Sequence, residues 1–393
     1  MAEATVIKPD LDFVKGVIAS GGDSLKKCYQ CATCSVVCNV TPDKNPFPRK
    51  EMIWAQWGLK EKFQGNPDVW LCHQCNDCTA YCPRGAKPGE VLGAIRKQTI
   101  SQYSKPASLV NLVNNRKMMP LLFLIPAIIL LAFVNWSAPL GETGFKEFMP
   151  VHKIQFVFVP AFFFGVVVGL LGVMSFFNDM KKAYGVTSGD LGGSLKAMAV
   201  DILTHNKFKK CDVSHDRYTS HLLVFFSFIA LGIATTFGVI YIDILGVETP
   251  FSLFGTGWIV KIFGIGGALG LLVGVVLMIK NRYVNAEKVG LGSYFDWLLI
   301  GIIGVIMASG ILSWMTRLSG IAGLAYLVYF IHLVFILSLF IYLPYSKLAH
   351  MFYRSAAICF NKYSGRESAA AAPQVETKPA VEPEEPKTEE KAE

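Results

Sequence analysis

Eight of the ten cysteines in this 393-residue chain form two runs with the same spacing. Each run has three cysteines at two-residue intervals and a fourth after three more residues: Cys28, Cys31, Cys34 and Cys38, then Cys72, Cys75, Cys78 and Cys82. This spacing is typical of [4Fe–4S] ligands, because three thiolates hold one cubane and the fourth is commonly given to the neighbouring cluster. The runs therefore predict two [4Fe–4S] clusters with crossed ligation, and one-electron chemistry.

Zinc and disulfides are the alternatives for these cysteines. Cys-x2-Cys pairs also build structural tetrahedral zinc sites, but two evenly spaced quartets are an unusual choice for zinc. Disulfides need an oxidising compartment, and the first residues do not resemble a secretory signal. We therefore expect the cysteine-bearing part to face a reducing cytoplasm, with Cys211 and Cys359 as free thiols.

Composition divides the chain near residue 118 and predicts an all-α fold. Residues 1–117 are polar and charged, and we interpret them as a cytoplasmic iron–sulfur domain of the α-helical ferredoxin type, with helices over 48–57 and 89–102. Residues 118–364 are strongly apolar and are interpreted as a transmembrane domain, in line with an overall mean hydropathy of +0.42. Residues 365–393 are rich in Ala, Pro, Glu, Lys and Thr, which predicts a disordered cytoplasmic tail.

Six apolar stretches are long enough to cross a bilayer, which needs about 20 residues. They cover 118–136, 153–177, 221–244, 257–280, 294–315 and 323–346. Basic residues follow spans two, four and six, at Lys181, Lys182, Lys196, Lys207, Lys209, Lys210, Arg217, Lys280, Arg282, Lys288, Lys347, Arg354 and Lys362. Because basic loops stay cytoplasmic, both termini are expected on the cytoplasmic side of the inner membrane.

This same bias explains the formal charge of +8, so no nucleic-acid binding is predicted. Residues 187–207 are expected to form an amphipathic helix on the inner membrane face, with a plain loop as the alternative.

Histidines in or beside the spans are candidate haem ligands, because an ionisable group inside a membrane usually has a functional partner. His332 lies within span six, and His350 follows eighteen positions later, which on a continuous helix is the same face about 27 Å away. The two ligands of one haem must lie at the same depth in the membrane, which pairs His350 with His221 and His332 with His152. These pairs predict two b-type haems. His215 or His205 could take the place of His221. The alternative is that these are interfacial histidines bonded to backbone or lipid.

The cysteine segments CYQCATCSVVC (28–38) and CHQCNDCTAYCP (72–83) resemble HdrC, the iron–sulfur protein of heterodisulfide reductase. The apolar part resembles HdrE, the membrane protein of that enzyme, and the two-haem gamma subunit of respiratory nitrate reductase. Their fusion in one chain resembles the membrane subunits of quinone-interacting membrane-bound oxidoreductase complexes of sulfate-reducing bacteria, over about residues 10–360. The fold implied is a dicluster domain followed by a six-helix cytochrome b bundle.

This resemblance implies that menaquinol is oxidised at the membrane and that electrons pass through haem b and the clusters to soluble subunits with flavin and iron–sulfur centres. The eventual acceptor would be adenylylsulfate reductase. Residues near the outer haem that can accept protons are candidates for the quinol site: His152, Lys153, Asp243 and Glu248.

Three other functions stay open. The chain could be a heterodisulfide-reductase-like or sulfite-pathway membrane subunit with a different soluble acceptor. It could be a haem-free anchor that docks iron–sulfur partners. It could also be a redox sensor, although no signalling output domain is present in the sequence.

Overall fold

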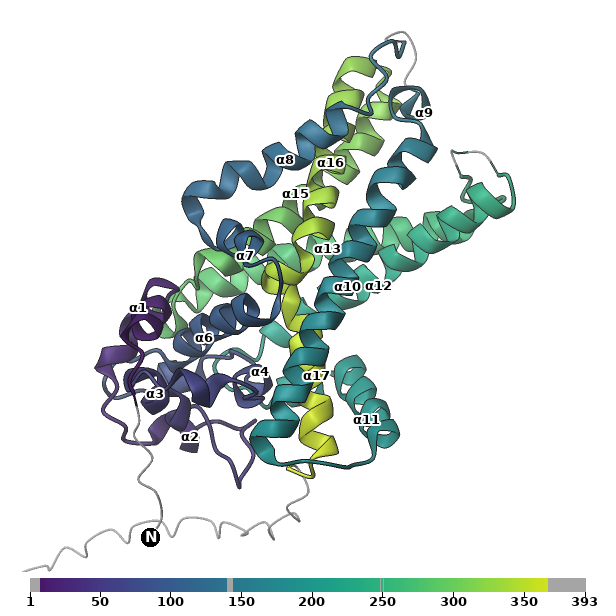
Figure 1. The fold of residues 1–393 in the computed structure, drawn as a ribbon. Coiled ribbons are helices and arrows are strands. Elements are labelled where there is room, and N and C mark those ends of the chain that lie inside the picture. The colour runs from purple at the N-terminus through teal and green to yellow at the C-terminus, as the bar shows by residue number, and fades with distance from the viewer. Residues whose placement is uncertain (1–7, 140–143, 248, 250, 367–393) are drawn as a thin grey trace, which may run out of the picture.

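The computed structural model describes residues 8–139, 144–247, 249 and 251–366, and every regular element within these ranges is helical. The all-α prediction is therefore confirmed. Figure 1 shows the short helices of the cysteine-bearing part gathered at one end, with the long helices extending away from it. The predicted tail lies outside the described residues from position 367 onward.

Short helices build the cysteine-bearing part. They are α1 (Leu11–Ala19), η1 (Asp23–Lys27), α2 (Thr33–Val36), α3 (Arg49–Gln56), η2 (Lys60–Phe63), α4 (Asp68–Leu71), α5 (Asp77–Ala80) and α6 (Pro88–Tyr103). The helices expected over 48–57 and 89–102 are confirmed as α3 and α6. Proline stands at the first position of α6, where its fixed φ suits a helix start and its missing N–H costs nothing.

Five helices are long and apolar enough to cross a membrane, with mean hydropathy between 2.2 and 2.5 over their best windows. They are α10 (Val151–Tyr184), α12 (Arg217–Val239) continued by the π-helical η5 (Ile240–Ile244), α13 (Trp258–Val284), α15 (Tyr294–Leu318), and α16 (Ala322–Tyr342) continued by η6 (Leu343–Tyr345). These helices account for predicted spans two to six.

The first predicted span, 118–136, contains one helix that ends at Leu131, and a sharp bend lies just before it. The chain forms α7 (Ala107–Asn114), then η3 (Arg116–Met118) and α8 (Met119–Leu131), with a bend of 91° between α7 and the rest. The 13 residues of α8 are about 20 Å long, short of the ~30 Å hydrocarbon core. After α8, the chain is held in a turn where Asn135 bonds to the backbone of Glu147 and Phe148 in α9 (Phe145–Phe148). A sixth span exists only if the bent pair is counted as one.

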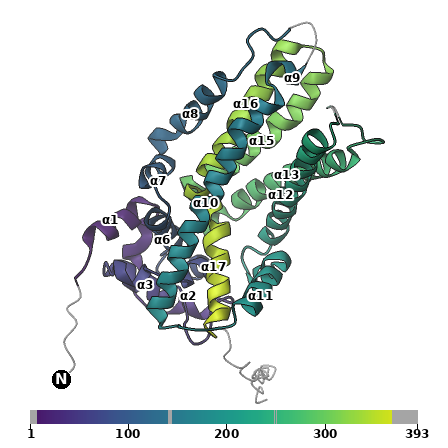
Figure 2. The same cartoon turned by 45° about the vertical axis from the view of Figure 1, so that its right-hand side comes forward.

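The long helices form two groups. In both views α8, α10, α15 and α16 run together, while α12 and α13 lie side by side and lean away from them (Figures 1 and 2). Small residues permit the close α12–α13 approach: a Cβ on Gly274 would stand 2.7 Å from the Val224 side chain, and one on Gly267 would stand 2.9 Å from Leu231.

The helix expected to continue from His332 to His350 is interrupted. Pro344 lies in η6, where α16 gives way to 3-10 turns, because proline cannot continue the backbone bonding of an α-helix. After η7 (Lys347–Ala349), α17 (His350–Tyr363) begins at the histidine itself. The two histidines therefore lie on different helices.

The segment between α10 and α12 contains α11 (Leu191–Thr204) and η4 (Asn206–Lys210), and α14 (Ala286–Val289) follows α13. The helix expected within 187–207 is confirmed as α11. Its Met198 and Ile202 pack against the core, whereas Leu191, Leu195 and Leu203 are exposed. This apolar exposed face is suited to the membrane surface.

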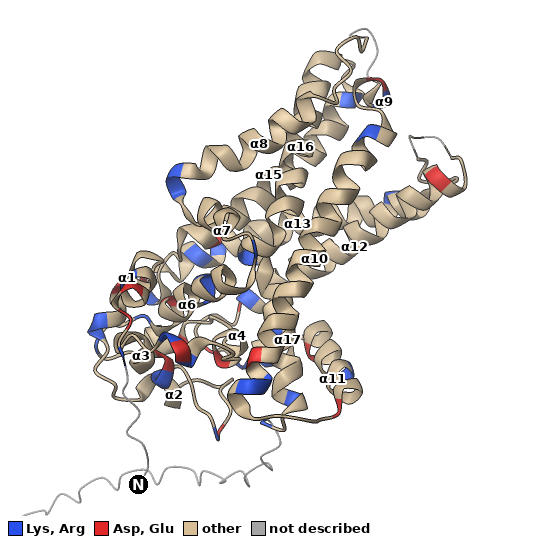
Figure 3. Cartoon of the chain, in the orientation of Figure 1, with Lys and Arg blue, Asp and Glu red and all other residues tan. Residues whose placement is uncertain are grey.

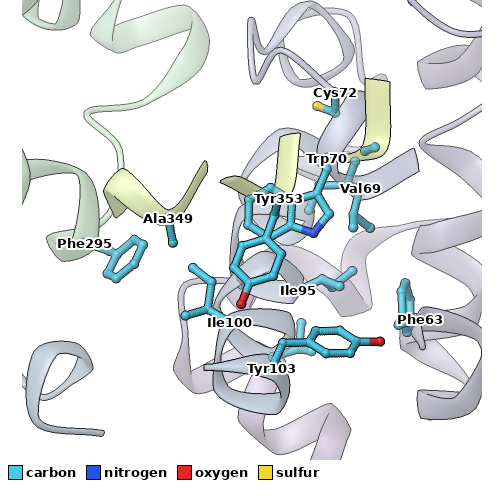
Figure 4. Packing of buried hydrophobic residues seen from close by; sticks show 14 of the residues in the cluster. Phe63, Val69, Trp70, Cys72, Ile95, Ile100, Tyr103, Phe295, Ala349 and Tyr353 are labelled. Atoms are coloured by element: carbon cyan, nitrogen blue, oxygen red, sulfur yellow. The ribbon is translucent and has the colours of Figure 1, made fainter. Parts of the chain in front are cut away.

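One hydrophobic core joins the cysteine-bearing part to the apolar part. Trp70 of α4 stacks on Tyr353 of α17 with ring centroids 5.1 Å apart, and Ile100 and Phe295 lie in the same cluster (Figure 4). Phe176 of α10 also belongs to it. This shared core fixes how the cysteine loops face the long helices. Figure 3 shows charged residues crowded around the cysteine-bearing end and sparse along the middle of the long helices.

Glu51 of α3 is fully buried, with its carboxylate 3.3 Å from the Lys50 ammonium, and burial raises the pKa of Glu51 to about 7. The folded state then binds more protons than the unfolded state, so stability is fully present below about pH 4.5 and is lost as pH rises through 7. We predict that Glu51→Gln flattens this dependence and gains on the order of 2 kcal/mol at pH 8. Melting temperatures at pH 5 and pH 8 in detergent measure it.

The matched control is Glu61→Gln, which neutralises an exposed carboxylate. An unchanged pH slope in Glu51→Gln would contradict the assignment.

Candidate functional site

The two cysteine loops share an unusual backbone conformation. In each loop, the residues just before and just after the second cysteine have positive φ, namely Gln30 and Ala32, then Gln74 and Asn76. Non-glycine residues seldom adopt this region, and such strain concentrates at functional sites. The backbone N–H groups of Gln30 and Gln74 point at the Cys28 and Cys72 sulfurs, at 3.4 and 3.3 Å. The two cysteine runs thus share a backbone conformation as well as a sequence spacing.

The eight cysteines sort into two sets. We call Cys28, Cys31, Cys34 and Cys82 the outer quartet, and Cys38, Cys72, Cys75 and Cys78 the inner quartet. Cys38 has Cys72 and Cys75 as electrostatic neighbours, and Cys34 has Cys28, Cys31 and Cys82. Burial, with the neighbouring thiolates, raises the pKa of both Cys34 and Cys38 to about 12. This exchange of the fourth cysteine is the grouping that crossed ligation requires.

The inner quartet surrounds a small cavity, which Val40, Phe47 and His73 also line. Four sulfurs converging on one apolar cavity fit a cubane cluster. Bound iron would remove the cysteine protons and balance the thiolate charge that burial otherwise opposes.

The two quartets differ in exposure. Cys31 is exposed, and so are three aromatic or apolar side chains within two residues of an outer-quartet cysteine: Tyr29, Val36 and Tyr81. By contrast, three members of the inner quartet are buried. The outer quartet therefore meets the surroundings, whereas the inner quartet meets the rest of the chain.

Two partly buried arginines lie against the inner quartet. Arg354 of α17 donates to the Cys72 carbonyl at 3.0 Å and lies 2.7 Å from His73 Nε2, and Arg96 of α6 donates to the same carbonyl at 2.6 Å. Burial lowers the pKa of Arg354 to about 10, which still leaves the guanidinium charged at neutral pH. The pair supplies positive charge where a reduced cluster would be most negative.

Three histidines meet one turn away from Arg354. The His350 and His221 rings have centroids 6.4 Å apart, and His205 lies 5.1 Å from His221. Two histidines that held one metal ion between them, each nitrogen about 2 Å from it, would have ring centres about 6 Å apart. The His221–His350 pair matches this spacing.

The protonation of these rings also suits ligation. Burial lowers the pKa of His350 to about 4, so the ring is neutral at pH 7, and its Nδ1 lies 2.7 Å from the Lys347 carbonyl. A ligating histidine typically donates its other N–H in this way. His221 Nδ1 is buried without a hydrogen-bond partner. The residues present therefore fit a haem iron at this position.

His332 is placed differently. Its Nδ1 lies 3.0 Å from the Ile306 carbonyl and 3.1 Å from the Ser309 hydroxyl, both on α15, and the missing side chain of Gly310 makes room for its ring. His152 is exposed in the first turn of α10, and no contact joins it to His332 in the described part of the chain. The structure does not bring this predicted pair together. His215 is exposed before α12.

Two of the candidate quinol residues, Lys153 and Asp243, bond to other residues and not to each other. Asp243 accepts a hydrogen bond from Gln155 at 2.7 Å, and Lys153 donates to the Phe133 carbonyl at 3.2 Å. Glu248 lies outside the described residues. Sequence reasoning missed Gln155, whose only signal was its place one turn after His152.

A cavity beside His350 was also missed. It is lined by Lys97, Glu90, Asp296 and Lys347 together with His350, and Lys347 forms a buried ion pair with Asp296. The sequence signals for this cavity were two charged residues: Lys347, three residues before His350, and Asp296, in the first turn of α15.

Comparison with known proteins supports the cysteine assignment. Residues 24–86 match the 4Fe-4S dicluster domain family. The chain is 34% identical over 90 residues to the HdrC-type protein of the H(2):CoB-CoM heterodisulfide,ferredoxin reductase of Methanothermobacter marburgensis, covering 23% of this chain and 48% of that protein. It is 33% identical over 85 residues to an HdrC-like protein of Archaeoglobus profundus, covering 21% and 45%. The chain thus spans about half the length of these relatives.

One relative extends over the apolar helices as well. The citrate utilization protein B of Escherichia coli is 23% identical over 377 residues, covering 88% of this chain and 93% of that protein. No solved structure matches the chain. The chain therefore contains an HdrC-like 4Fe-4S dicluster domain, followed by five long apolar helices, or six if the bent pair is counted as one span.

Crossed ligation predicts which variants resemble each other. Cys38→Ser and Cys75→Ser should both remove the inner cluster's electron paramagnetic resonance signal and leave the outer one, because both residues belong to one quartet. Cys82→Ser and Cys31→Ser should do the reverse. Cys359→Ala, a change at a buried cysteine of α17 outside both runs, is the control. If Cys38→Ser instead removed the same signal as Cys31→Ser, the ligation would be uncrossed.

Proposed function

We propose that this chain is the membrane subunit of a quinol-oxidising electron-transfer complex, with haem b and two [4Fe–4S] clusters as its one-electron carriers and menaquinol as its donor. The observation that carries the proposal is the position of the His221–His350 pair. It lies at the boundary between the long helices and the dicluster domain, beside the inner quartet.

Arg354 connects these two sites. It lies four residues after His350 on α17, hence on the same face of the helix, and it touches both the Cys72 carbonyl and the His73 ring. These contacts fix the inner cysteine loop against the helix that begins with a haem-ligand candidate. A short, rigid separation of this kind suits electron transfer between fixed centres.

His73 adds to this packing. Its ring contacts Phe208 of η4 at 5.3 Å, and Phe208 in turn lies 5.6 Å from His221. Burial and the adjacent Arg354 lower the pKa of His73 well below its usual value, so this ring is neutral and adds no charge between the sites.

The outer quartet, whose Cys31 is exposed, is proposed as the exit for electrons. The side chains around it, Tyr29, Val36 and Tyr81, are exposed and apolar or aromatic, as expected of a surface covered by another protein. Its partners would be soluble subunits with flavin and iron–sulfur centres, with adenylylsulfate reductase as the eventual acceptor.

The orientation proposed is the one in which the dicluster domain and both termini face the cytoplasm. Basic residues after α10, α13 and α16 lie at the end that carries the dicluster domain (Figure 3). At the opposite end, His152, Lys153 and Asp243 remain the candidate quinol residues, with Gln155 as their hydrogen-bonded neighbour. A second haem at His332 would need a ligand that His152 does not supply in this arrangement.

A reduced-minus-oxidised optical spectrum tests the proposal. The complex, reduced with a menaquinol analogue, should show b-type bands. His350→Ala and His221→Ala should each remove one haem's bands, because both ligands serve the same iron. His215→Ala, a change at an exposed histidine near His221 in sequence, should leave the spectrum unchanged.

Absence of b-type bands in the unaltered complex would overturn the haem-linked function. It would favour the second candidate, a haem-free membrane anchor for iron–sulfur partners.

Two other acceptors follow from the relatives. The match to the HdrC-type proteins favours a heterodisulfide-reductase-like complex, and a sulfite-pathway complex is the other alternative of this kind. The citrate utilization relative, which matches across the apolar helices too, favours a complex acting on an organic acid. Identifying the subunits that co-purify separates these alternatives, because each acceptor requires a different soluble partner.

A further inference from the structure

Residues 210–217, from the last residue of η4 to the first of α12, close over the inner cysteine loop; we call them the covering loop. The Asp77 carboxylate accepts hydrogen bonds from the backbone N–H groups of Asp212 and Val213, both at 3.0 Å. The Ser214 hydroxyl donates to the Cys75 carbonyl at 2.8 Å. The covering loop is thus bonded directly to the segment that carries Cys75 and Cys78.

Further bonds hold the covering loop at both ends. Asn39, next to Cys38, donates to the Lys210 carbonyl at 3.1 Å, and Tyr81 donates to Asp212 at 2.6 Å. Arg217 donates to the Gln74 carbonyl. The loop is therefore held in one position relative to the inner quartet.

Cys211 is the residue that this arrangement places on the inner quartet. Only 2% of it is exposed. Its sulfur lies within 4.8 Å of both the Cys75 sulfur and an Asp77 carboxylate oxygen, and the neighbouring Cys211 thiol raises the pKa of Cys75. Neither cysteine run contains Cys211, and its spacing predicts no cluster role.

Chemistry decides which sulfur donates in this pair. A cysteine that ligates iron is a thiolate and has no proton to give. Cys211 would keep its proton and donate an S–H bond to the Cys75 sulfur. Asp77 is a poorer acceptor for that proton, because the covering loop's N–H groups already occupy both of its oxygens.

We propose that Cys211 is a positioning residue that raises the reduction potential of the inner cluster by hydrogen-bonding to its ligand Cys75. One-electron reduction adds negative charge to the cluster and its sulfurs, so a donor at the ligand stabilises the reduced form more than the oxidised form. No proton leaves Cys211 in this step. The inference rests on the proposed function, since it assumes that the inner quartet holds a cluster.

A potentiometric titration followed by electron paramagnetic resonance tests the proposal on the full-length protein within its complex. In Cys211→Ala the inner signal should titrate at lower potential. At a fixed potential the reduced-to-oxidised ratio should fall about tenfold, the size of one hydrogen bond to a charged group. Cys211→Ser keeps a donor and should restore most of the ratio. The outer signal should not move in either variant.

Ser214→Ala is the matched control, because it removes a bond from the same loop to the same residue at the carbonyl instead of the sulfur. An equal shift in Ser214→Ala would assign the effect to loop packing and overturn the proposal. An unchanged potential of the inner signal in Cys211→Ala would also overturn the proposal. Loss of the inner cluster in both Cys211 variants would overturn it too, because Cys211 would then be a structural residue or a ligand. Absence of the inner signal from the unaltered protein would instead refute the cluster assignment beneath the proposed function.

Discussion

The fold depends on the burial of one cysteine loop against the helices that follow it in the chain by more than a hundred residues. The loop that begins at Cys72 has peptide carbonyls in a buried setting, where an unpaired carbonyl would be costly. Arg96 and Arg354 satisfy the Cys72 carbonyl, and Arg217 and Ser214 satisfy those of Gln74 and Cys75. The dicluster domain is therefore fixed to the long helices at the edge of the inner quartet.

This attachment places the two quartets in different surroundings. One quartet is enclosed by α6, α17 and the covering loop, next to a histidine pair, and the other is open to a partner. A chain of carriers needs this asymmetry, because electrons must enter from one neighbour and leave to another. The hydrophobic core supports it, since Trp70 and Tyr353 stack across the junction and leave little freedom for the domain to turn.

The environment of the inner quartet also bears on its redox behaviour. Two arginines and a thiol surround it in a buried setting, where charges and hydrogen bonds act more strongly than in water. The outer quartet is more open, because Cys31 is exposed and Cys28 and Cys82 are partly exposed, so water screens its charges more strongly. Identical cysteine spacing thus leads to two different electrostatic surroundings.

Much of this was available from the sequence, for a physical reason: cysteine spacing and long apolar stretches are local properties. The two cysteine runs, the helices α3 and α6 and five of the spans follow from residues close together in the chain. What depended on distant contacts did not. The bend before α8 and the break at Pro344 are changes in the direction of the chain, and a hydropathy pattern does not predict the direction of a helix. The meeting of His221, His350 and Arg354, and the place of Cys211 on Cys75, were decided by packing between elements more than a hundred positions apart, which only the tertiary structure determines.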